Sequence, residues 1–212
     1  MTSTLYFGGS SNIAQELAKN FKNIDAVSSR KVSNVYRKLF IIKKYNSLGF
    51  KKLEKKINVK YDNILIFNGF YTSSFLSMFN RKNFINDFEI NYLIPMEIAS
   101  FAIKKKILKK NGAIYFISSI AASEHQIGNA NYSISKNALN FSSKILGNEQ
   151  KKREIRVNTI SFGLIKNEMG LKVKKMTNTN KKFVSLKKIV KRIKLVLSDK
   201  KTNKRNFKFY ND

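Results

Sequence analysis

Short apolar runs alternate with amphipathic stretches along the chain, and this alternation predicts its architecture. A short run rich in Ile, Val, Phe and Tyr is typical of a buried strand, whereas apolar residues three or four positions apart indicate a helix. The predicted strands cover residues 3–7, 24–29, 38–43, 63–67, 113–118, 155–161 and 205–210. The predicted helices cover residues 13–21, 50–57, 88–110, 131–149 and 186–197. Pro95 gives the third of these helices a site for a kink.

Strands and helices that alternate over a whole chain favour an α/β fold with a parallel sheet. In such sheets, ligands bind beyond the carboxyl ends of the strands. Polar and glycine residues gather at these ends, namely Gly8 and Gly9, Ser29 and Arg30, Asn68 and Gly69, Ser118 and Ser119, and Gly163. The sequence therefore predicts one polar edge of the sheet as the working face.

The chain length and composition limit which classes of protein this can be. The 212 residues, 42% of them apolar, are enough for a sizeable core, so residues 1–212 are expected to form a single domain. Cysteine is absent, which excludes disulfides and thiolate chemistry, and no metal site is predicted. The first apolar run begins at Thr4, which leaves no room for a signal peptide, and no apolar stretch approaches the roughly 20 residues that span a bilayer. A cytoplasmic protein without membrane insertion is expected.

Basic residues dominate the charge. Lysine and arginine number 42 against 13 aspartate and glutamate residues, for a net charge of +29. Such a charge attracts nucleic acid, anionic lipid or an acidic partner. The basic residues are spread widely, and lysine, asparagine, isoleucine and phenylalanine are all abundant, so a compositional bias of the source genome is the favoured explanation. A selected polyanion-binding surface is the alternative, although basic and aromatic residues do not interleave as they do in single-strand binders.

Tyr132 and Lys136 lie one turn apart on the predicted helix 131–149 and share a face. An ammonium close to a phenol favours the phenolate, so this spacing predicts a lowered tyrosine pKa and a proton donor or acceptor near neutral pH. Ser119 stands thirteen residues before the tyrosine, at a strand end, where its hydroxyl can share a substrate oxygen. The Tyr-x-x-x-Lys spacing is also common on helix surfaces, so it is weak evidence by itself.

Several ordered motifs resemble the short-chain dehydrogenase/reductase family, and the resemblance runs almost end to end. They are the turn YFGGSSNIA (6–14), the strand DNILIFNG (62–69), the helix FEINYLIPMEI (88–98), Ser119 before YSISK (132–136), and IRVNTISFGLIKNEM (155–169). The resemblance implies a doubly wound parallel sheet, the Rossmann fold, with about seven strands and helices on both faces. It also implies an oxidoreductase that uses a nicotinamide cofactor to reduce a carbonyl or oxidise an alcohol.

The same resemblance implies roles for individual residues. Tyr132 would be the general acid in carbonyl reduction, Lys136 would tune it and bind the nicotinamide ribose, and Ser119 would polarise the substrate carbonyl. Asn91 would hold a water that relays protons toward the lysine, whereas Ser118 is expected to pack in its strand. The residues expected to contact the cofactor are Gly8, Ser10, Ser11, Asn12, Ile13, Ser29, Arg30, Asn68, Gly69, Tyr132, Lys136, Gly163, Ile165 and Asn167.

The end of the second predicted strand, SSRK (28–31), indicates the cofactor. Folds that prefer NAD usually carry an acidic residue there for the ribose 2′-hydroxyl, whereas arginine suits a 2′-phosphate. No acidic residue follows Asp25 in this region, so Ser29, Arg30 and Lys31 favour NADP(H) over NAD(H) and, with it, the reductive direction. The alternative is that Arg30 and Lys31 are two more basic surface residues.

The sequence departs from the family pattern at several positions. Asn12 and Ala14 stand where the family has the second and third glycines of the turn, although asparagine tolerates left-handed backbone and alanine adds only a methyl group. Phe162 replaces a proline, and Asn167 replaces the threonine that usually contacts the carboxamide. The family's acidic residue after the third strand has no match in FIIKKYNS (40–47), and its NNAG appears as IFNG (66–69), so different adenine contacts are expected. The connection between the second and third strands is too short for a full helix, and the brief segment 169–185 predicts an open or minimal lid.

Partners and substrates follow from the same resemblance. The family assembles through helices 88–110 and 131–149, so a homodimer or homotetramer that acts on a small-molecule carbonyl or alcohol is expected, and nucleic acid is not. A 3-oxoacyl thioester reductase and a sugar or nucleotide-sugar reductase both stay open. The alternative outside enzymes is a basic protein that senses the cofactor or binds polyanions. His125, the one histidine, and the lysines of helix 186–197 are expected to be solvated.

Overall fold

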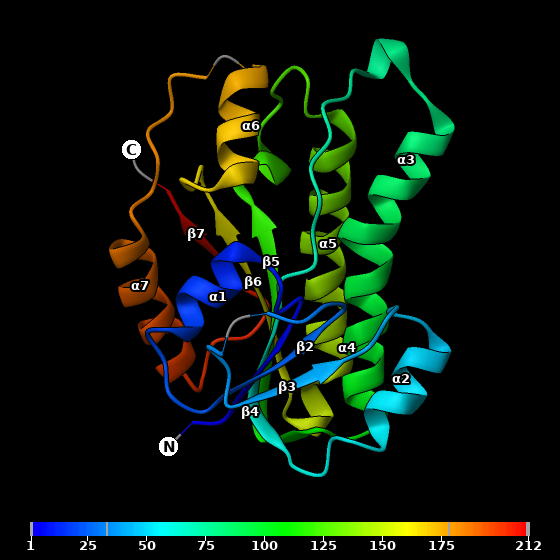
Figure 1. The fold of residues 1–212 in the computed structure, drawn as a ribbon, viewed down its shortest axis with the longest axis vertical. Helices are drawn as coiled ribbons and strands as arrows, with labels where there is room; N and C mark the ends of the chain where they lie inside the picture. Colours follow the sequence, from blue (N-terminus) through cyan, green and yellow to red (C-terminus); the bar gives the residue numbers. More distant parts are fainter. Residues whose placement is uncertain (1, 33, 178, 211–212) are drawn as a thin grey trace.

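Seven parallel strands form one sheet in the order β3-β2-β1-β4-β5-β6-β7 (Figure 1). The computed structural model describes residues 2–32, 34–177 and 179–210. The strands are β1 (Thr4–Phe7), β2 (Ile24–Ser28), β3 (Lys38–Ile41), β4 (Tyr61–Ile66), β5 (Leu108–Ser119), β6 (Arg156–Phe162) and β7 (Asn206–Phe209). The order reverses between β1 and β4, as in a doubly wound sheet, so the predicted Rossmann-like α/β fold is confirmed.

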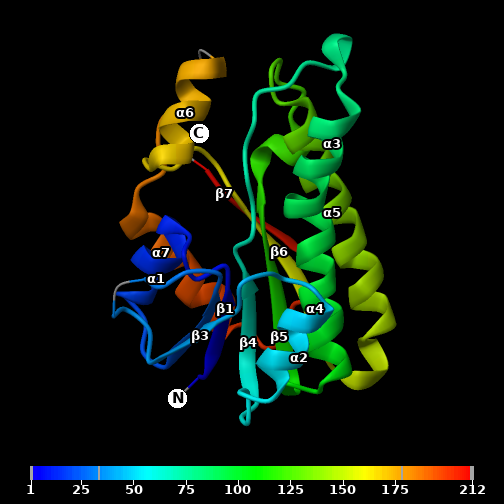
Figure 2. The ribbon, with the colours of Figure 1, turned by 45° about the vertical axis from the view of Figure 1, so that its right-hand side comes forward.

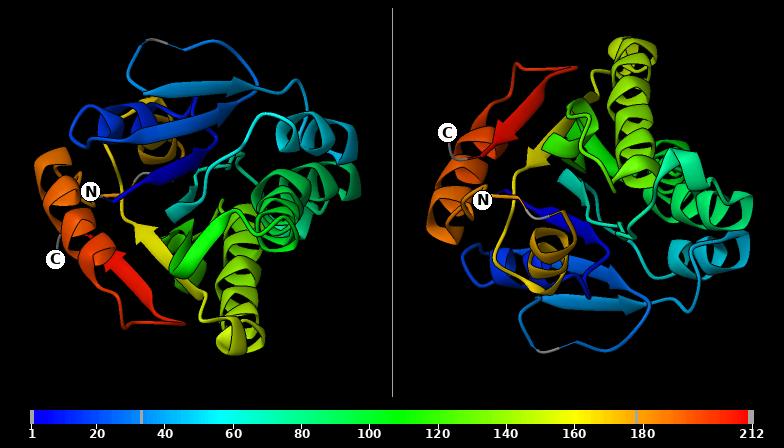
Figure 3. Two further views of the ribbon diagram at one scale, coloured as in Figure 1. Left: turned by 90° about the horizontal axis from the view of Figure 1, so that it is seen from below. Right: turned by 90° about the horizontal axis from the view of Figure 1, so that it is seen from above.

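Helices cover both faces of the twisted sheet, as the views from below and from above in Figure 3 show. One face carries α1 (Asn12–Ala18) and α7 (Leu186–Ser198), and the other carries α2 (Ser47–Glu54), α4 (Ile94–Lys104) and α5 (Ala130–Glu149) (Figure 2). Beyond the carboxyl ends of the strands stand α3 (Arg81–Phe88) and α6 (Glu168–Thr177). The remaining turns are η1 (Leu76–Met78), the π turn η2 (Glu89–Leu93), η3 (Ile120–Ser123) and η4 (Lys151–Arg153). No helix among the described residues is long and apolar enough to cross a bilayer.

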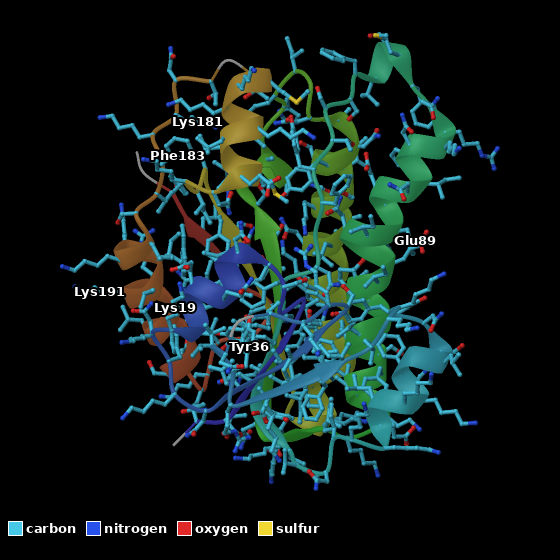
Figure 4. The ribbon with its side chains drawn as sticks, in the orientation of Figure 1. Lys19, Tyr36, Glu89, Lys181, Phe183 and Lys191 are labelled. Atoms are coloured by element: carbon cyan, nitrogen blue, oxygen red, sulfur yellow. The ribbon has the colours of Figure 1, made fainter. Side chains whose placement is uncertain are left out.

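Successive side chains of each strand point to opposite faces of the sheet, and the apolar ones form a layer on each face. On β1, Leu5 points to the layer under α4 and α5, whereas Tyr6 points to the layer under α1 and α7. In α7, Ile189 and Ile193 are fully buried, while Lys191 points into solvent (Figure 4). The amphipathic period that predicted this helix therefore also decides which side it buries, and its lysines are solvated as expected.

The connection from β6 to β7 differs in hand from the other crossovers. From β4 through β6 the chain advances across the sheet with α4 and α5 on one face. From β6 to β7 it advances in the same direction, but α7 lies on the other face. Parallel crossovers are almost always right-handed, so this one is a left-handed exception. The chain reaches α7 after passing beyond the carboxyl edge of the sheet, and α6 lies on that path (Figure 1).

The predicted helix 88–110 is wrong at both ends. Helical structure begins at Arg81, passes through the π turn η2 and ends at Lys104. Pro95 explains the π turn, because it has no amide hydrogen to bond the carbonyl of Asn91 four residues earlier. The expected irregularity near Pro95 is therefore a wide turn just before it.

The residues after α4 form strand where the spacing predicts helix. Lys106 adopts a left-handed φ of 53° and ends the helical path. Ile107 and Leu108 are then buried beside β4, where the Ile107 carbonyl accepts from the Tyr61 amide at 2.9 Å. A pair of apolar residues next to lysines is compatible with both the helical period and the strand period. Pairing within the sheet decides between the two. Within residues 29–32 and 34–37 the connection from β2 to β3 contains no helix, as expected.

Candidate active site

The carboxyl edge of the sheet brings the predicted catalytic residues together. Ser119 ends β5, Tyr132 and Lys136 lie in the first two turns of α5, and Asn91 lies in η2. The Lys136 ammonium is 5.9 Å from the centroid of the Tyr132 ring, and the Ser119 hydroxyl hydrogen-bonds the Tyr132 side chain. The end of β5 and the four-residue spacing on α5 therefore bring a hydroxyl, a phenol and an amine together.

Lys136 is deeply buried for a lysine, with only 2% of its surface exposed. Its ammonium donates to the carbonyl of Ile117 in β5 at 3.0 Å and to the carbonyl of Asn68 after β4 at 3.4 Å. Burial disfavours the charged form and lowers the pKa of Lys136 to about 7. This amine therefore exchanges its proton in the neutral range.

Tyr132 has the opposite shift from the one that the lysine spacing predicts. Burial raises the pKa of Tyr132 to about 12, and the hydrogen bond with Ser119 lowers it by a smaller amount. The Tyr71 ring stands edge-on to the Tyr132 ring, with centroids 5.6 Å apart. Removal from water outweighs the nearby amine, which is itself only partly protonated at pH 7. The phenol therefore carries its proton at neutral pH.

Asn91 fastens the segment that follows β4. Its side-chain oxygen accepts from the Phe70 amide at 2.8 Å, and its side-chain nitrogen donates to the Phe70 carbonyl at 2.9 Å. A Cβ on Gly69 would stand 3.2 Å from the Lys136 nitrogen and 3.4 Å from the Asn91 side-chain oxygen, so glycine keeps this segment close to the site. The Asn91 side chain is thus committed to the backbone, and a water-holding role would fall to its main-chain carbonyl.

The glycine-rich turn after β1 needs both of its glycines. Gly8 has a φ of +77°, and a Cβ there would lie 3.0 Å from the Asn68 amide nitrogen. A Cβ on Gly9 would lie 2.9 Å from the Cβ of Ala26 in β2. Gly9, absent from the predicted cofactor contacts, therefore fits the turn against β2. The doubled glycine in the sequence was the available signal for it.

Two tyrosine hydroxyls hold this turn, and the sequence did not point to either. Tyr36, labelled in Figure 4, donates to the Gly9 carbonyl at 2.7 Å. Tyr45 accepts from the Gly8 amide at 3.1 Å and donates to the Val27 carbonyl of β2 at 3.2 Å. Burial raises the pKa of Tyr45 to about 12 and that of Tyr36 further still. Both come from loops flanking β3, and no spacing in the sequence links them to the turn.

Unpaired polar groups at this edge fit a dinucleotide. The Asn68 side-chain oxygen is buried and has no hydrogen-bond partner among the described residues. Ser11 precedes α1 as its N-cap without a side-chain capping bond, so the first amides of this helix have no side-chain acceptor from it. Gly8 and Gly69 leave the space that side chains would fill. The helix amides therefore suit phosphates at the turn, and the Asn68 oxygen and the Lys136 amine suit the hydroxyls of a ribose.

Basic groups surround the expected adenine end. The Ser28 hydroxyl donates to the Arg30 carbonyl at 2.7 Å and accepts from the Arg30 amide at 3.2 Å, which shapes the turn after β2. Ser29, Arg30 and Lys31 are exposed, and no hydrogen bond or ion pair fixes the Arg30 guanidinium within the part of the chain that the structure describes. Eight Lys or Arg residues and no Asp or Glu occupy positions 26–53. The end of β2 therefore carries exposed positive charge and no exposed carboxylate.

The one carboxylate of β2 faces away from this edge. Asp25 is fully buried near the start of the strand, where Arg37 binds both of its oxygens at 2.9 and 2.6 Å and the Tyr61 hydroxyl donates at 2.7 Å. This buried cluster joins β2 to β4 and to the residue before β3. Asp25 is therefore structural and does not substitute for an acidic ribose contact.

The segment after β6 forms a one-helix lid. The Asn167 side-chain oxygen accepts from the Gly170 amide at 2.8 Å and so caps α6, which leaves its NH₂ group as the donor toward a carboxamide. A Cβ on Gly170 would lie 1.8 Å from the Ile165 carbonyl, so only glycine allows this tight start. Lys181, labelled in Figure 4 beyond α6, pairs with Glu124 on the facing loop. The minimal lid expected from the sequence is thus present and tied across the pocket.

One pocket joins these elements. The predicted site residues that line it are Ser11, Ile13, Gly69, Ser119, Tyr132, Lys136, Gly163, Ile165 and Asn167. The predicted residues outside its lining are Gly8, Ser10, Asn12, Ser29, Arg30, Asn68 and Asn91. The pocket therefore unites the expected nicotinamide and substrate region, while the expected adenine region lies beyond it.

The substrate side of the pocket has an apolar wall and a polar end. Met169 and Val173 of α6 face it, as do Glu124, Gln126 and Asn129 of the loop before α5. Gln126 donates to Glu124 at 2.9 Å and accepts from Asn129 at 2.9 Å. The neighbouring His125 is exposed, as expected. None of these loop contacts follows from a motif in the sequence.

Comparisons with known proteins agree with this architecture. A family model described as enoyl-(acyl carrier protein) reductase matches residues 49–195. Carbonyl reductase family member 4 of Xenopus laevis is 28% identical over 179 residues, which are 77% of this chain and 75% of the relative. The 3-oxoacyl-[acyl-carrier-protein] reductase FabG of Rickettsia conorii is 36% identical over 107 residues, so the match spans 50% of this chain but only 44% of that relative.

Solved structures share the fold over nearly the whole chain. ElxO with NADP bound has a TM-score of 0.80 at 18% identity, covering 99% of this chain and 97% of the other. 4-Hydroxyisoleucine dehydrogenase complexed with NADH has a TM-score of 0.78 at 22% identity, covering 98% and 96%. Since the family model covers more than half of the sequence, this chain belongs to the short-chain dehydrogenase/reductase family of oxidoreductases.

Proposed function

We propose that this protein reduces a ketone or aldehyde to an alcohol with NADP(H). The observation that carries the proposal is the constellation of Ser119, Tyr132 and Lys136 in the lining of one pocket, next to a glycine turn that fits a dinucleotide. We further propose that residues 1–212 act as one domain, and a cytoplasmic location stays a prediction.

The residues divide the proton chemistry among them. A bound nicotinamide supplies the hydride for the carbonyl carbon. Tyr132, protonated at neutral pH, donates its proton to the carbonyl oxygen, so that the substrate gains both hydrogens of the alcohol. Ser119 shares that oxygen through its hydroxyl. Lys136, with a pKa of about 7, is the nearby group that exchanges protons at neutral pH and stabilises the phenolate left behind.

The cofactor preference rests on the end of β2. Exposed Arg30 and Lys31, with the absence of acidic residues from positions 26–53, support a 2′-phosphate over a free hydroxyl. Structures that share the fold have either NADP or NADH bound, so the fold alone supports neither. We therefore place NADP(H) first and NAD(H) second.

Tyr132→Phe tests the mechanism. The variant keeps the ring contact with Tyr71 and loses only the proton donor, so turnover should fall at least about a thousandfold, while the NADPH dissociation constant stays within about twofold. Titration of nicotinamide fluorescence measures binding, and NADPH consumption measures turnover. Wild-type rates in the variant would rule out this role for Tyr132, and a wild-type protein that binds no dinucleotide would rule out the function.

The substrate class calls for a direct comparison. The named relatives include a carbonyl reductase and a 3-oxoacyl-[acyl-carrier-protein] reductase, which supports small carbonyls and acyl thioesters as the first candidates. NADPH consumption across 3-oxoacyl thioesters, keto-sugars and small ketones would decide among them.

Self-association is part of the same proposal. Ile134, Phe141 and Ile145 are exposed on α5, beside Leu93 of η2 and Ile85 of α3. These apolar residues support a homodimer or homotetramer through this helical face. Sedimentation velocity of wild type and Phe141→Ser measures it, and the variant should shift toward the monomer.

A further inference from the structure

Large apolar side chains are exposed at the end of the molecule where the pocket opens. They come from residues 75–79, from loop 124–128 and from α6, and Figures 1 and 2 show η1 and α6 at this same end. These residues, here called the apolar rim, are Phe75 (47% exposed), Leu76 (62%), Met78 (76%), Phe79 (57%), Ile127 (81%), Met169 (36%), Leu171 (52%) and Met176 (52%). Single exposed apolar residues are ordinary, whereas a gathering of this kind marks an interaction surface.

A hydrogen bond and an ion pair join the segments that carry the apolar rim. The Ser74 amide donates to the Gly128 carbonyl at 3.0 Å, which ties the start of the first segment to the loop. Lys181, just after α6, pairs with Glu124 of the same loop. Glu124 and α6 both line the pocket, so the apolar rim borders its mouth on more than one side.

Positive charge accompanies the apolar rim. Residues 75–82, 124–128 and 168–183 contain seven Lys or Arg and two Asp or Glu. One of the two carboxylates, Glu124, is already paired with Lys181. Exposed cations remain within these segments, among them Arg81, Lys82, Lys172 and Lys175. Apolar side chains together with lysines are the two signals that hold a protein on an anionic lipid surface.

A second copy of the chain is a poorer occupant. An interface between two copies commonly pairs the same patch on both, which here would bring the basic groups of the apolar rim face to face. The apolar residues on α5 form a separate face that suits a second copy. Lipid phosphates would instead neutralise the lysines while the acyl region takes the apolar side chains.

We propose that the apolar rim docks on an anionic bilayer surface, with the pocket mouth turned toward the lipid. The docking is peripheral, since no described helix can cross a bilayer. A carbonyl substrate dissolved at the bilayer interface would then reach Tyr132 without passing through bulk water. This inference goes beyond the proposed reduction and does not depend on its cofactor.

Vesicle sedimentation in 0.15 M salt tests the proposal. Wild type should bind vesicles of equal parts phosphatidylglycerol and phosphatidylcholine at least tenfold better than phosphatidylcholine alone. Leu76→Ser/Met78→Ser should lower that binding at least tenfold. The matched control, Leu48→Ser/Leu195→Ser, removes two side chains that are 61% and 64% exposed elsewhere and should bind like wild type.

A second pair of variants separates the apolar rim from general charge. Lys172→Gln/Lys175→Gln should weaken vesicle binding several-fold more than Lys51→Gln/Lys52→Gln, because only the first pair lies beside the pocket. Equal losses in the two pairs, or equal binding of wild type to both lipid mixtures, would overturn the proposal. So would a lower sedimentation coefficient of Leu76→Ser/Met78→Ser without vesicles, which would make the apolar rim an interface between copies. Retention on immobilised polyglutamate without vesicle binding would overturn it in favour of an acidic protein.

Discussion

Replacing Lys136 by methionine is expected to stabilise the fold at neutral pH while destroying the site. The side chain is 2% exposed, and burial lowers its pKa to about 7, against about 10.4 for an unfolded chain. At pH 7 the unfolded chain keeps the proton on Lys136, whereas the folded protein binds it more weakly. Protonation of this amine therefore stabilises the unfolded state. At about 1.36 kcal/mol per pKa unit, this amounts to about 4 kcal/mol against the folded state at pH 7.

Two lost hydrogen bonds offset part of the gain. Methionine leaves the carbonyls of Ile117 and Asn68 without the ammonium, at about 1 kcal/mol each, so the net gain at pH 7 is about 2 kcal/mol. Because the folded pKa is the lower one, the wild-type penalty fades as the pH rises from 7 toward 10 and is about 2 kcal/mol at pH 9. The advantage of the variant should therefore vanish near pH 9.

Urea unfolding at pH 7 and pH 9, followed by circular dichroism, measures both free energies. Lys191→Met is the matched control, because it makes the same substitution at a lysine that is exposed on α7. A Lys136→Met variant that is less stable than wild type by the same amount at both pH values would refute the reasoning about the buried amine.

Three further changes test other parts of the site. Arg30→Ala should raise the NADPH dissociation constant about tenfold, as expected for the loss of a charged hydrogen bond, and leave that of NADH nearly unchanged; equal losses would remove the 2′-phosphate argument. Tyr45→Phe should weaken NADPH binding several-fold by loosening the glycine turn, whereas Tyr115→Phe, which also removes a buried hydroxyl bound to a carbonyl, should not. Glu124→Gln should release the partner of Lys181 and speed amide exchange in residues 179–184, while unfolding free energy falls by less than about 1 kcal/mol; unchanged exchange would mean that the pair does not hold the lid.

The sequence predicts the parts of the site that local rules control. A strand end places Ser119, and the helical period brings Tyr132 and Lys136 to one face, so their grouping follows from patterns within the chain. Tyr36 and Tyr45 could not be found in this way, because their hydroxyls reach the glycine turn only after separate loops fold around β3.

Burial also lies outside what spacing can predict. The Tyr-x-x-x-Lys pattern gives proximity but not the loss of water, and that loss reverses the expected direction of the Tyr132 pKa. The C-terminal end of the predicted helix 88–110 is wrong for a similar reason. Ile107 and Leu108 fit both the helical period and the strand period, and pairing with β4 decides in favour of strand. Local pattern therefore predicts which residues gather, and tertiary packing decides their chemistry.

Because of the π turn η2, the geometry of the site depends on the number of residues in this helix and not only on their identity. Deleting Tyr92 or Leu93 would remove the extra residue of the π turn and would rotate the preceding residues by about 100° relative to α4. Asn91 would then turn away from Phe70, and the segment after β4 would lose both of its bonds to that side chain. Substitutions that keep Asn91 and Pro95 leave this register in place, whereas an insertion or deletion within residues 89–93 shifts it.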